Sequence, residues 1–221
     1  MKAPVWDLPT RLFHWAVVLL IGLSYWSAEN AFEPWHFWSG YALLFLLLFR
    51  ILWGFVGSST ARFSAFVRGP SDVIRYARTG SWPLAGHSPL GALSVLAMLL
   101  ALTVQVVSGL IQIDSEDFVE GPLSRLVSLE TAEAAHEVNQ VSFNILLALI
   151  GLHLAAILFY RLALERRLVG PMVTGGAKLA DGVRPMTPAP AWRAWACAAA
   201  AASLTCWIAA GAPPLTQGVL P

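Results

Sequence analysis

Long uncharged runs of apolar residues alternate with short polar segments along the chain. The runs are Leu12–Ala28, Pro34–Phe49 with its continuation Ile51–Gly57, Pro83–Ile113, Val138–Tyr160 and the stretch from Ala194 onward. A helix needs about 20 predominantly apolar residues to cross the hydrocarbon core of a bilayer, which is about 30 Å thick. The pattern therefore predicts five transmembrane helices. The first is short, and its flanking Arg11 and Glu29 can extend to the headgroups.

The first and last runs each have a second interpretation. A cleaved signal peptide would explain Leu12–Ala28, but a small-x-small cleavage site is missing and Asp7 interrupts the basic leader. The last run contains the alanines Ala198–Ala202 and both cysteines but no histidine, and a Pro/Gly-rich linker precedes it. We therefore expect a four-helix unit in residues 1–178, followed by a linker and an additional C-terminal transmembrane helix in residues 179–221.

The composition agrees with an all-α integral membrane protein. Hydrophobic residues make up 57% of the chain and charged residues 12%, whereas soluble domains carry about 25% charged residues. An ordinary soluble enzyme is therefore excluded, and we expect membrane lipid and no nucleic acid among the partners. The two cysteines are too few for a disulfide framework or a Cys-rich metal site.

The few charges predict the orientation. If the N-terminus lies inside, all but one of the 14 Lys and Arg residues fall in the inner segments, and the outer loops hold only Arg125. Nine of the 13 Asp and Glu residues fall outside. Because inner loops carry the excess of Lys and Arg, the N-terminus is predicted to be cytoplasmic. The net charge of +1 is a cancellation between the two sides.

The five histidines lie at two depths of the predicted bundle. His14 and His153 are near the inner side, His36 and His136 are near the outer side, and His87 begins the third span on the inner side. Ionisable residues in membrane helices usually mark functional sites, and bundles build cofactor sites from side chains on facing helices. Two imidazoles at each depth would suit the two faces of a six-coordinate haem. The spacing therefore indicates two stacked b haems.

Other interpretations of the histidines compete with this one. A single histidine near the interface is commonly a polar anchor. His136 and His153 are 17 residues apart, which is roughly 25 Å along a helix and about 100° around it, so both haems could not share one face. Zinc needs converging ligands, and no Cys-x-x-Cys-His motif is present for covalent haem attachment.

Several segments resemble the bacterial cytochrome b561-like proteins, which include the cytochrome b subunits of Ni,Fe-hydrogenases. The matching segments are Trp6–Trp15, His36–Tyr41, Phe49–Gly57, Gly86–Gly91, Gly151–His153 and the stretch from Arg161 to Gly175, which ends in Pro171-Met172-Val173-Thr174-Gly175. The resemblance covers about residues 4–178. It implies a four-helix bundle with two b haems in a bacterial inner membrane, carrying electrons between quinol or quinone and a redox partner.

The resemblance also assigns ligands residue by residue. It places haem ligands at His14, His36 and His153. The family has about 14 residues between the two histidines of the fourth helix, and this spacing leads to Asn139 here. Asparagine does not replace histidine as an axial ligand. Either His136 takes the role from one turn away, or the outer haem is altered or absent.

Four further residues are candidates for cofactor binding on the inner side. His87 would hydrogen-bond a haem propionate or a quinone, or else be an interface residue at a helix start. Arg50, Arg62 and Arg68 are candidate counter-ions for the propionates, although the positive-inside rule explains them equally well.

These observations predict a di-haem b-type cytochrome with quinone as a possible substrate. The acidic outer loop from Asp114 to Glu137, including Glu116, Asp117 and Glu120, would attract a positively charged c-type cytochrome. Three alternatives stay open. The chain would be a superoxide:quinone oxidoreductase, the membrane anchor of a hydrogenase or dehydrogenase, or a haem-free transporter or assembly factor.

Overall fold

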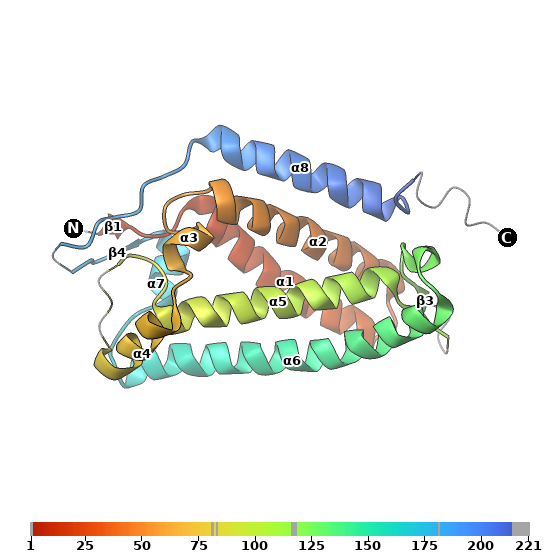
Figure 1. Cartoon of the computed structure of the whole chain (residues 1–221), viewed down its shortest axis with the longest axis horizontal. Helices are drawn as coiled ribbons and strands as arrows, with labels where there is room; N and C mark the ends of the chain where they lie inside the picture. The colour runs from red at the N-terminus through yellow and green to blue at the C-terminus, as the bar shows by residue number, and fades with distance from the viewer. Residues whose placement is uncertain (1, 81, 83, 116–118, 181, 214–221) are drawn as a thin grey trace. The chain divides into compact units, whose positions relative to one another are not determined.

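The computed structural model describes residues 2–80, 82, 84–115, 119–180 and 182–213. Its four longest helices are α1 (Leu8–Glu29), α2 (Glu33–Val56), α5 (Pro89–Ile111) and α6 (Leu129–Leu162). Each is long and apolar enough to cross a membrane. The first four predicted spans are therefore confirmed as helices, and Figure 1 shows their order along the chain.

Shorter elements connect these helices. They are α3 (Phe63–Phe66), α4 (Pro70–Thr79), the 3-10 helix η1 (Ser124–Leu126), α7 (Val169–Thr174), α8 (Ala191–Ala209), and the two-residue strands β1 (Ala3–Pro4), β2 (Ile113–Asp114), β3 (Val119–Glu120) and β4 (Gly176–Ala177). The last apolar run forms α8, which has 19 residues. This helix is not among the candidate spans of the described chain, so a fifth span stays a prediction.

The chain forms two compact units, and α1, α2, α5, α6 and α8 each contribute a segment to both. The first unit contains residues 1–16, 50–98 and 149–197, and the second contains residues 17–49, 99–148 and 198–221. The predicted domain boundary at residue 178 stays a prediction.

In the first unit, the N-terminal segment is tied to the segment that follows α6. Strands β1 and β4 pair antiparallel, and the backbone N–H groups of Val5 and Trp6 donate to the carbonyl of Gly175 at 2.8 and 3.0 Å. The Arg11 guanidinium donates to the Val173 carbonyl at 2.6 Å. Gly175 has a positive φ of 85° and caps the end of α7, which is a conformation that favours glycine.

The start of α1 is fixed by a buried carboxylate. Asp7 is 8% exposed, and its Oδ1 accepts a hydrogen bond from the Thr10 backbone N–H at 2.8 Å, as an N-cap residue does. Its Oδ2 accepts a second hydrogen bond from Trp53 Nε1, near the end of α2, at 3.0 Å. Asp7 therefore caps one membrane helix and holds another beside it. Further along the first unit, α8 begins beside the end of α2 (Figure 1).

In the second unit, α6 begins nine residues earlier than the uncharged run predicts. Ser128 Oγ accepts a hydrogen bond from the Thr131 backbone N–H at 3.3 Å and caps the helix. The added turns are rich in alanine and glutamate, which favour a helix without an apolar run. His136 therefore lies inside a helix.

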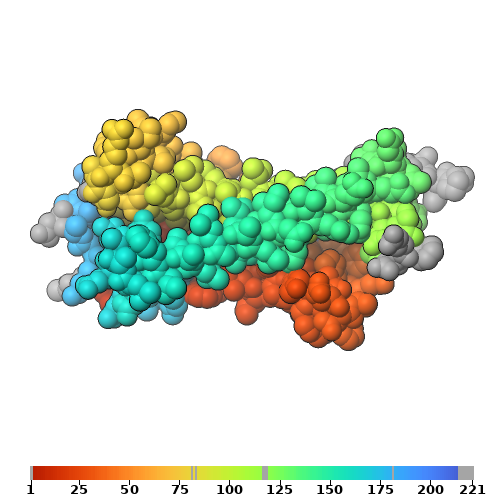
Figure 2. All heavy atoms as spheres, turned by 90° about the horizontal axis from the view of Figure 1, so that it is seen from below, coloured from red at the N-terminus to blue at the C-terminus, as the bar shows by residue number. Residues whose placement is uncertain are grey.

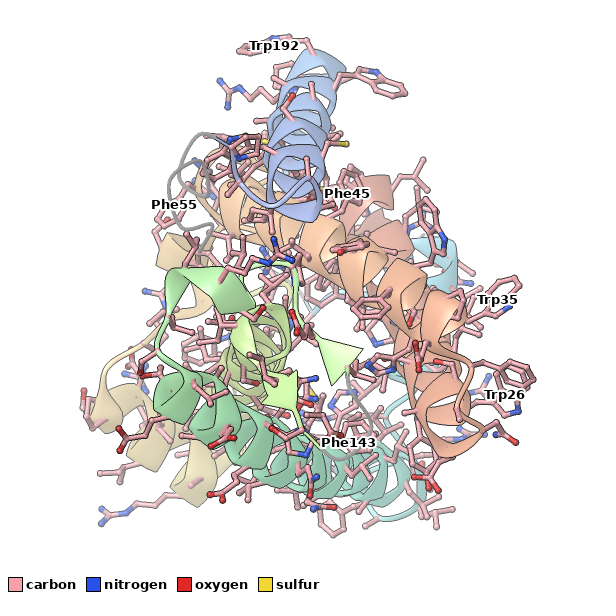
Figure 3. The ribbon with its side chains drawn as sticks, turned by 90° about the vertical axis from the view of Figure 1, so that its right-hand side faces the viewer. Trp26, Trp35, Phe45, Phe55, Phe143 and Trp192 are labelled. Atoms are coloured by element: carbon pink, nitrogen blue, oxygen red, sulfur yellow. The ribbon has the colours of Figure 1, made fainter. Side chains whose placement is uncertain are left out.

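Aromatic side chains cover the end of the second unit where α1 and α2 are joined. Trp26 and Trp35 project away from the helices (Figure 3) and are 49% and 57% exposed. Trp26 also stacks on Phe32 at a ring-centroid distance of 5.3 Å. Exposed tryptophans at helix ends are typical of a membrane–water interface.

Candidate functional site

Three of the five histidines lie together in the first unit. His87 lies just before the first residue of α5. Burial, followed by the charge of Arg50, lowers the pKa of His87 to about 3. His153 and His14 act in the same direction, so both lie within electrostatic range of His87. The structure therefore brings together the two histidines that the sequence places at the inner depth, one from α1 and one from α6.

The ring of His87 lies in an aromatic environment. Its centroid is 4.6 Å from that of Trp6 and 4.9 Å from that of Phe66. Its Nδ1 is buried and has no hydrogen-bond partner among the described residues. A neutral imidazole in this position retains a hydrogen-bonding atom that the described protein does not use.

Arg50 is the buried cation of this site. It is 2% exposed, and its guanidinium carbon lies 5.1 Å from the ring centroid of Phe63 and 6.0 Å from that of Phe66. Asp7 attracts its charge, yet Arg50 Nη1 is buried without a hydrogen-bond partner within the described chain. A buried charge with unused donors is costly, so this guanidinium is well suited to an anionic group of a ligand.

The other two predicted arginines are placed differently. Arg62 is exposed at the start of α3. Arg68 is partly buried, donates to the Ala65 carbonyl at 2.8 Å, and lies 5.9 Å from the ring centroid of Trp82. Of these three arginines, Arg50 is the one whose charge acts on His87.

Sequence reasoning missed the parts played by Asp7 and Trp6. Asp7 holds the helix that carries His14, and Trp6 contacts the ring of His87. A signal was available for Asp7, because Asp just before an apolar helical run is a typical N-cap. The contact between Trp6 and His87 joins residues that are 81 positions apart, and no local pattern predicts it.

In the second unit, His36 has the arrangement expected of an oriented metal ligand. Its Nδ1 lies 3.1 Å from the Ser24 carbonyl oxygen. Metal-binding histidines commonly donate one ring N–H to such an acceptor, which leaves the other nitrogen available for the metal. A Cβ added at Gly40, four residues along α2, would meet no atom within 4 Å. The helix surface at Gly40, one turn from His36, is therefore open.

His136 is oriented by different contacts. Its Nε2 lies 2.7 Å from Gln140 Nε2 and 3.8 Å from Asp114 Oδ2. Its Nδ1 is buried with no partner among the residues that the structure describes. His136 is thus partly engaged by its neighbours, whereas His36 is oriented with Nε2 available.

Asn139 belongs to a polar cluster between α5 and α6. Its Nδ2 donates to the Gln105 carbonyl at 2.8 Å and to Ser108 Oγ at 3.1 Å, and its Oδ1 accepts from Gln105 Nε2 at 2.9 Å. Ser142 donates to Gln105 Oε1. These bonds use the amide of Asn139 for helix packing. The sequence pattern did not identify Gln105 or Ser142, although polar residues within an apolar run are a signal.

The donor sets fit a group held by histidines from different helices. No group of three or more His, Cys, Asp or Glu residues that could hold a metal ion occurs in the described ranges. The buried Arg50 donor, which has no partner among the described residues, and the open face at Gly40 are features that a bound haem would use. The residues therefore fit b haem, most completely in the first unit.

Comparison with known proteins agrees with this chemistry. A family model described as prokaryotic cytochrome b561 matches residues 5–175. The matched range contains all five histidines, Arg50 and Asn139. No curated protein matches the chain, and no solved structure matches it either.

Proposed function

The chain belongs to the prokaryotic cytochrome b561 family, and it is therefore a multi-pass membrane protein that transfers electrons as a b-type cytochrome. We propose that it carries electrons across the bilayer between a quinone pool and a redox partner. Bound haem supplies one-electron exchange at its iron. The protein residues have to bind the group, set its environment and keep it within electron-transfer range of the partner.

The observation that carries this proposal is that His14 and His153 both lie within electrostatic range of His87. Helix bundles hold cofactors with side chains from facing helices, and we propose that His14 of α1 and His153 of α6 would hold a b haem. Both residues lie on long helices, which would keep their imidazoles in place.

Arg50 and His87 are proposed to bind the polar edge of the same group. The buried guanidinium of Arg50 has a donor without a partner among the described residues, and a propionate would supply the acceptor. His87 is proposed to hydrogen-bond a propionate or a quinone through its unused ring nitrogen. Arg62 and Arg68 are secondary candidates for the propionates, nearer the surface.

A second haem is proposed in the second unit, where His36 and His136 would hold it. The contact between His36 and Ser24 supports the first ligand. His136 Nε2 contacts Gln140 in the structure and would have to leave this contact to hold the group. Since position 139 holds Asn, a weakened or absent outer haem is the competing outcome.

The proposed orientation places the N-terminus in the cytoplasm of a bacterial cell and the acidic loops on the outer side of the inner membrane. Glu120, Glu130, Glu133 and Glu137 are exposed in the second unit. Such a surface suits a positively charged partner, a c-type cytochrome or a dehydrogenase or hydrogenase subunit. Glu116 and Asp117 of the predicted docking patch lie outside the described residues. We also propose that α8 crosses the membrane as a fifth span.

Reduction by a quinol tests this function. The purified chain is expected to show a b-haem Soret band and to be reduced by a water-soluble quinol. His153→Ala should lose the part of the Soret absorption that comes from the haem assigned to His14 and His153. Asn144→Ala changes an exposed position of α6 and should behave like the wild type. Purified protein without a Soret band would support a haem-free transporter or assembly factor instead.

A further inference from the structure

The end of α6 carries a hollow that the electron-transfer proposal does not use. Its wall is formed by Leu154, Ile157, Leu158 and Arg161, which lie on one face of the helix at the i, i+3, i+4 and i+7 positions. The chain then turns, and Arg167 to Val169 close the other side. The cavity volume is about 480 Å³, within the range of small-ligand sites. Figure 2 shows this end of α6 on the molecular surface.

The hollow combines an apolar wall with two cations. Leu154 and Leu158 are 59% and 56% exposed, as expected for side chains that contact acyl chains. Arg161 and Arg167 are both exposed. Neither forms an ion pair with a carboxylate in the described part of the chain. The charges of both guanidinium groups are therefore available to a ligand.

We propose that this hollow binds one anionic phospholipid, with its phosphate between Arg161 and Arg167 and an acyl chain along Leu154 and Leu158. The apolar wall belongs to a membrane-spanning helix, so the ligand enters from the bilayer. Two guanidinium groups at the end of the wall require a negative headgroup, and arginine pairs phosphate well. A quinone has a neutral head and would leave both charges uncompensated. This inference does not depend on haem binding.

The charge of the two arginines sets the expected selectivity. Each basic residue near a membrane surface favours an anionic lipid by about fivefold, so the pair should give about 30-fold selectivity. Salt weakens this preference, because the screening length falls to about 3 Å at 1 M. An acyl chain is also required, since the wall contributes contact area that a free phosphate cannot fill.

Native mass spectrometry of the full chain tests the proposal. The protein is mixed with equal amounts of phosphatidylglycerol and phosphatidylcholine of the same acyl chains. We expect the first bound lipid to be phosphatidylglycerol by about 30-fold, and inorganic phosphate at equal ionic strength should not displace it. The variant R161Q/R167Q should lose the selectivity. The control R75Q/R78Q, with two exposed arginines of α4 exchanged, should keep it.

Three results would overturn the proposal. They are equal binding of both lipids to the wild type, unchanged selectivity in R161Q/R167Q, and displacement of the lipid by inorganic phosphate. If R161Q/R167Q does not fold, the wild type alone decides between the outcomes. Loss of selectivity at 1 M salt would then support the site, and retained selectivity would contradict it.

Discussion

Replacing Asp7 by alanine should destabilise the helix packing of the first unit more than any surface substitution. The carboxylate caps α1 through the Thr10 N–H and accepts the indole N–H of Trp53 from α2. It also attracts the buried charge of Arg50. One side chain thus connects three features that the histidine site requires.

The magnitude follows from the bonds that the substitution removes. Loss of an N-cap costs about 1 kcal/mol, and loss of a buried hydrogen bond to a charged group costs about 2 kcal/mol. We therefore expect Asp7→Ala to reduce the free energy of unfolding by about 3 kcal/mol. For a chain of this size, the corresponding fall in Tm is about 6–12 °C. Asp7→Asn keeps the cap and should lose about half as much.

The assay is thermal unfolding in lipid nanodiscs, followed by tryptophan fluorescence. The matched control is Asp72→Ala, which removes an exposed ion pair to Arg75 with an N···O distance of 2.7 Å. Such pairs contribute about 0–1 kcal/mol, so the Tm of the control should fall by less than about 4 °C. Equal Tm values for Asp7→Ala and Asp72→Ala would refute the role given to Asp7.

Two further substitutions test packing in each unit by thermal unfolding. Gly54→Ala should reduce the free energy of unfolding by about 1–3 kcal/mol, because its Cβ would overlap the ring of Phe63. At the control position Gly22 a Cβ meets nothing within 4 Å, so Gly22→Ala should be neutral or slightly stabilising. Asn139→Ala removes the hydrogen bonds to α5 and should reduce the free energy of unfolding by about 1–2 kcal/mol. The side chain of Asn144 bonds within its own helix, so Asn144→Ala should have little effect. A neutral Gly54→Ala, or equal effects of the two asparagine variants, would contradict these expectations.

The four membrane helices could be predicted because an apolar run of the required length has few other structures available in a bilayer. The early start of α6 could not be found from hydropathy, since its first turns are stabilised by helix propensity and by the cap at Ser128. The amphipathic helix α4 likewise has no uncharged apolar run to predict it, because it carries Asp72, Arg75 and Arg78.

The candidate site was predictable in its residue types but not in its partners. Histidines in apolar helices stand out in the sequence, and their order along the helices gives their approximate depth. The environment of His87, however, comes from Trp6 and Phe66, which are distant from it in sequence. Long-range contacts of this kind depend on how the helices pack, and a single sequence does not encode them as a local pattern.

Haem stoichiometry measured by the pyridine haemochrome method tests the central claim most directly. The account predicts two haems per wild-type chain, one in His153→Ala and one in His136→Ala, and two in the control Asn144→Ala, which changes an exposed position of α6. Unchanged stoichiometry in His136→Ala would move the outer ligand elsewhere or indicate a single haem. Unchanged stoichiometry in His153→Ala would contradict the assignment of His14 and His153 as an axial pair, and with it the account as a whole.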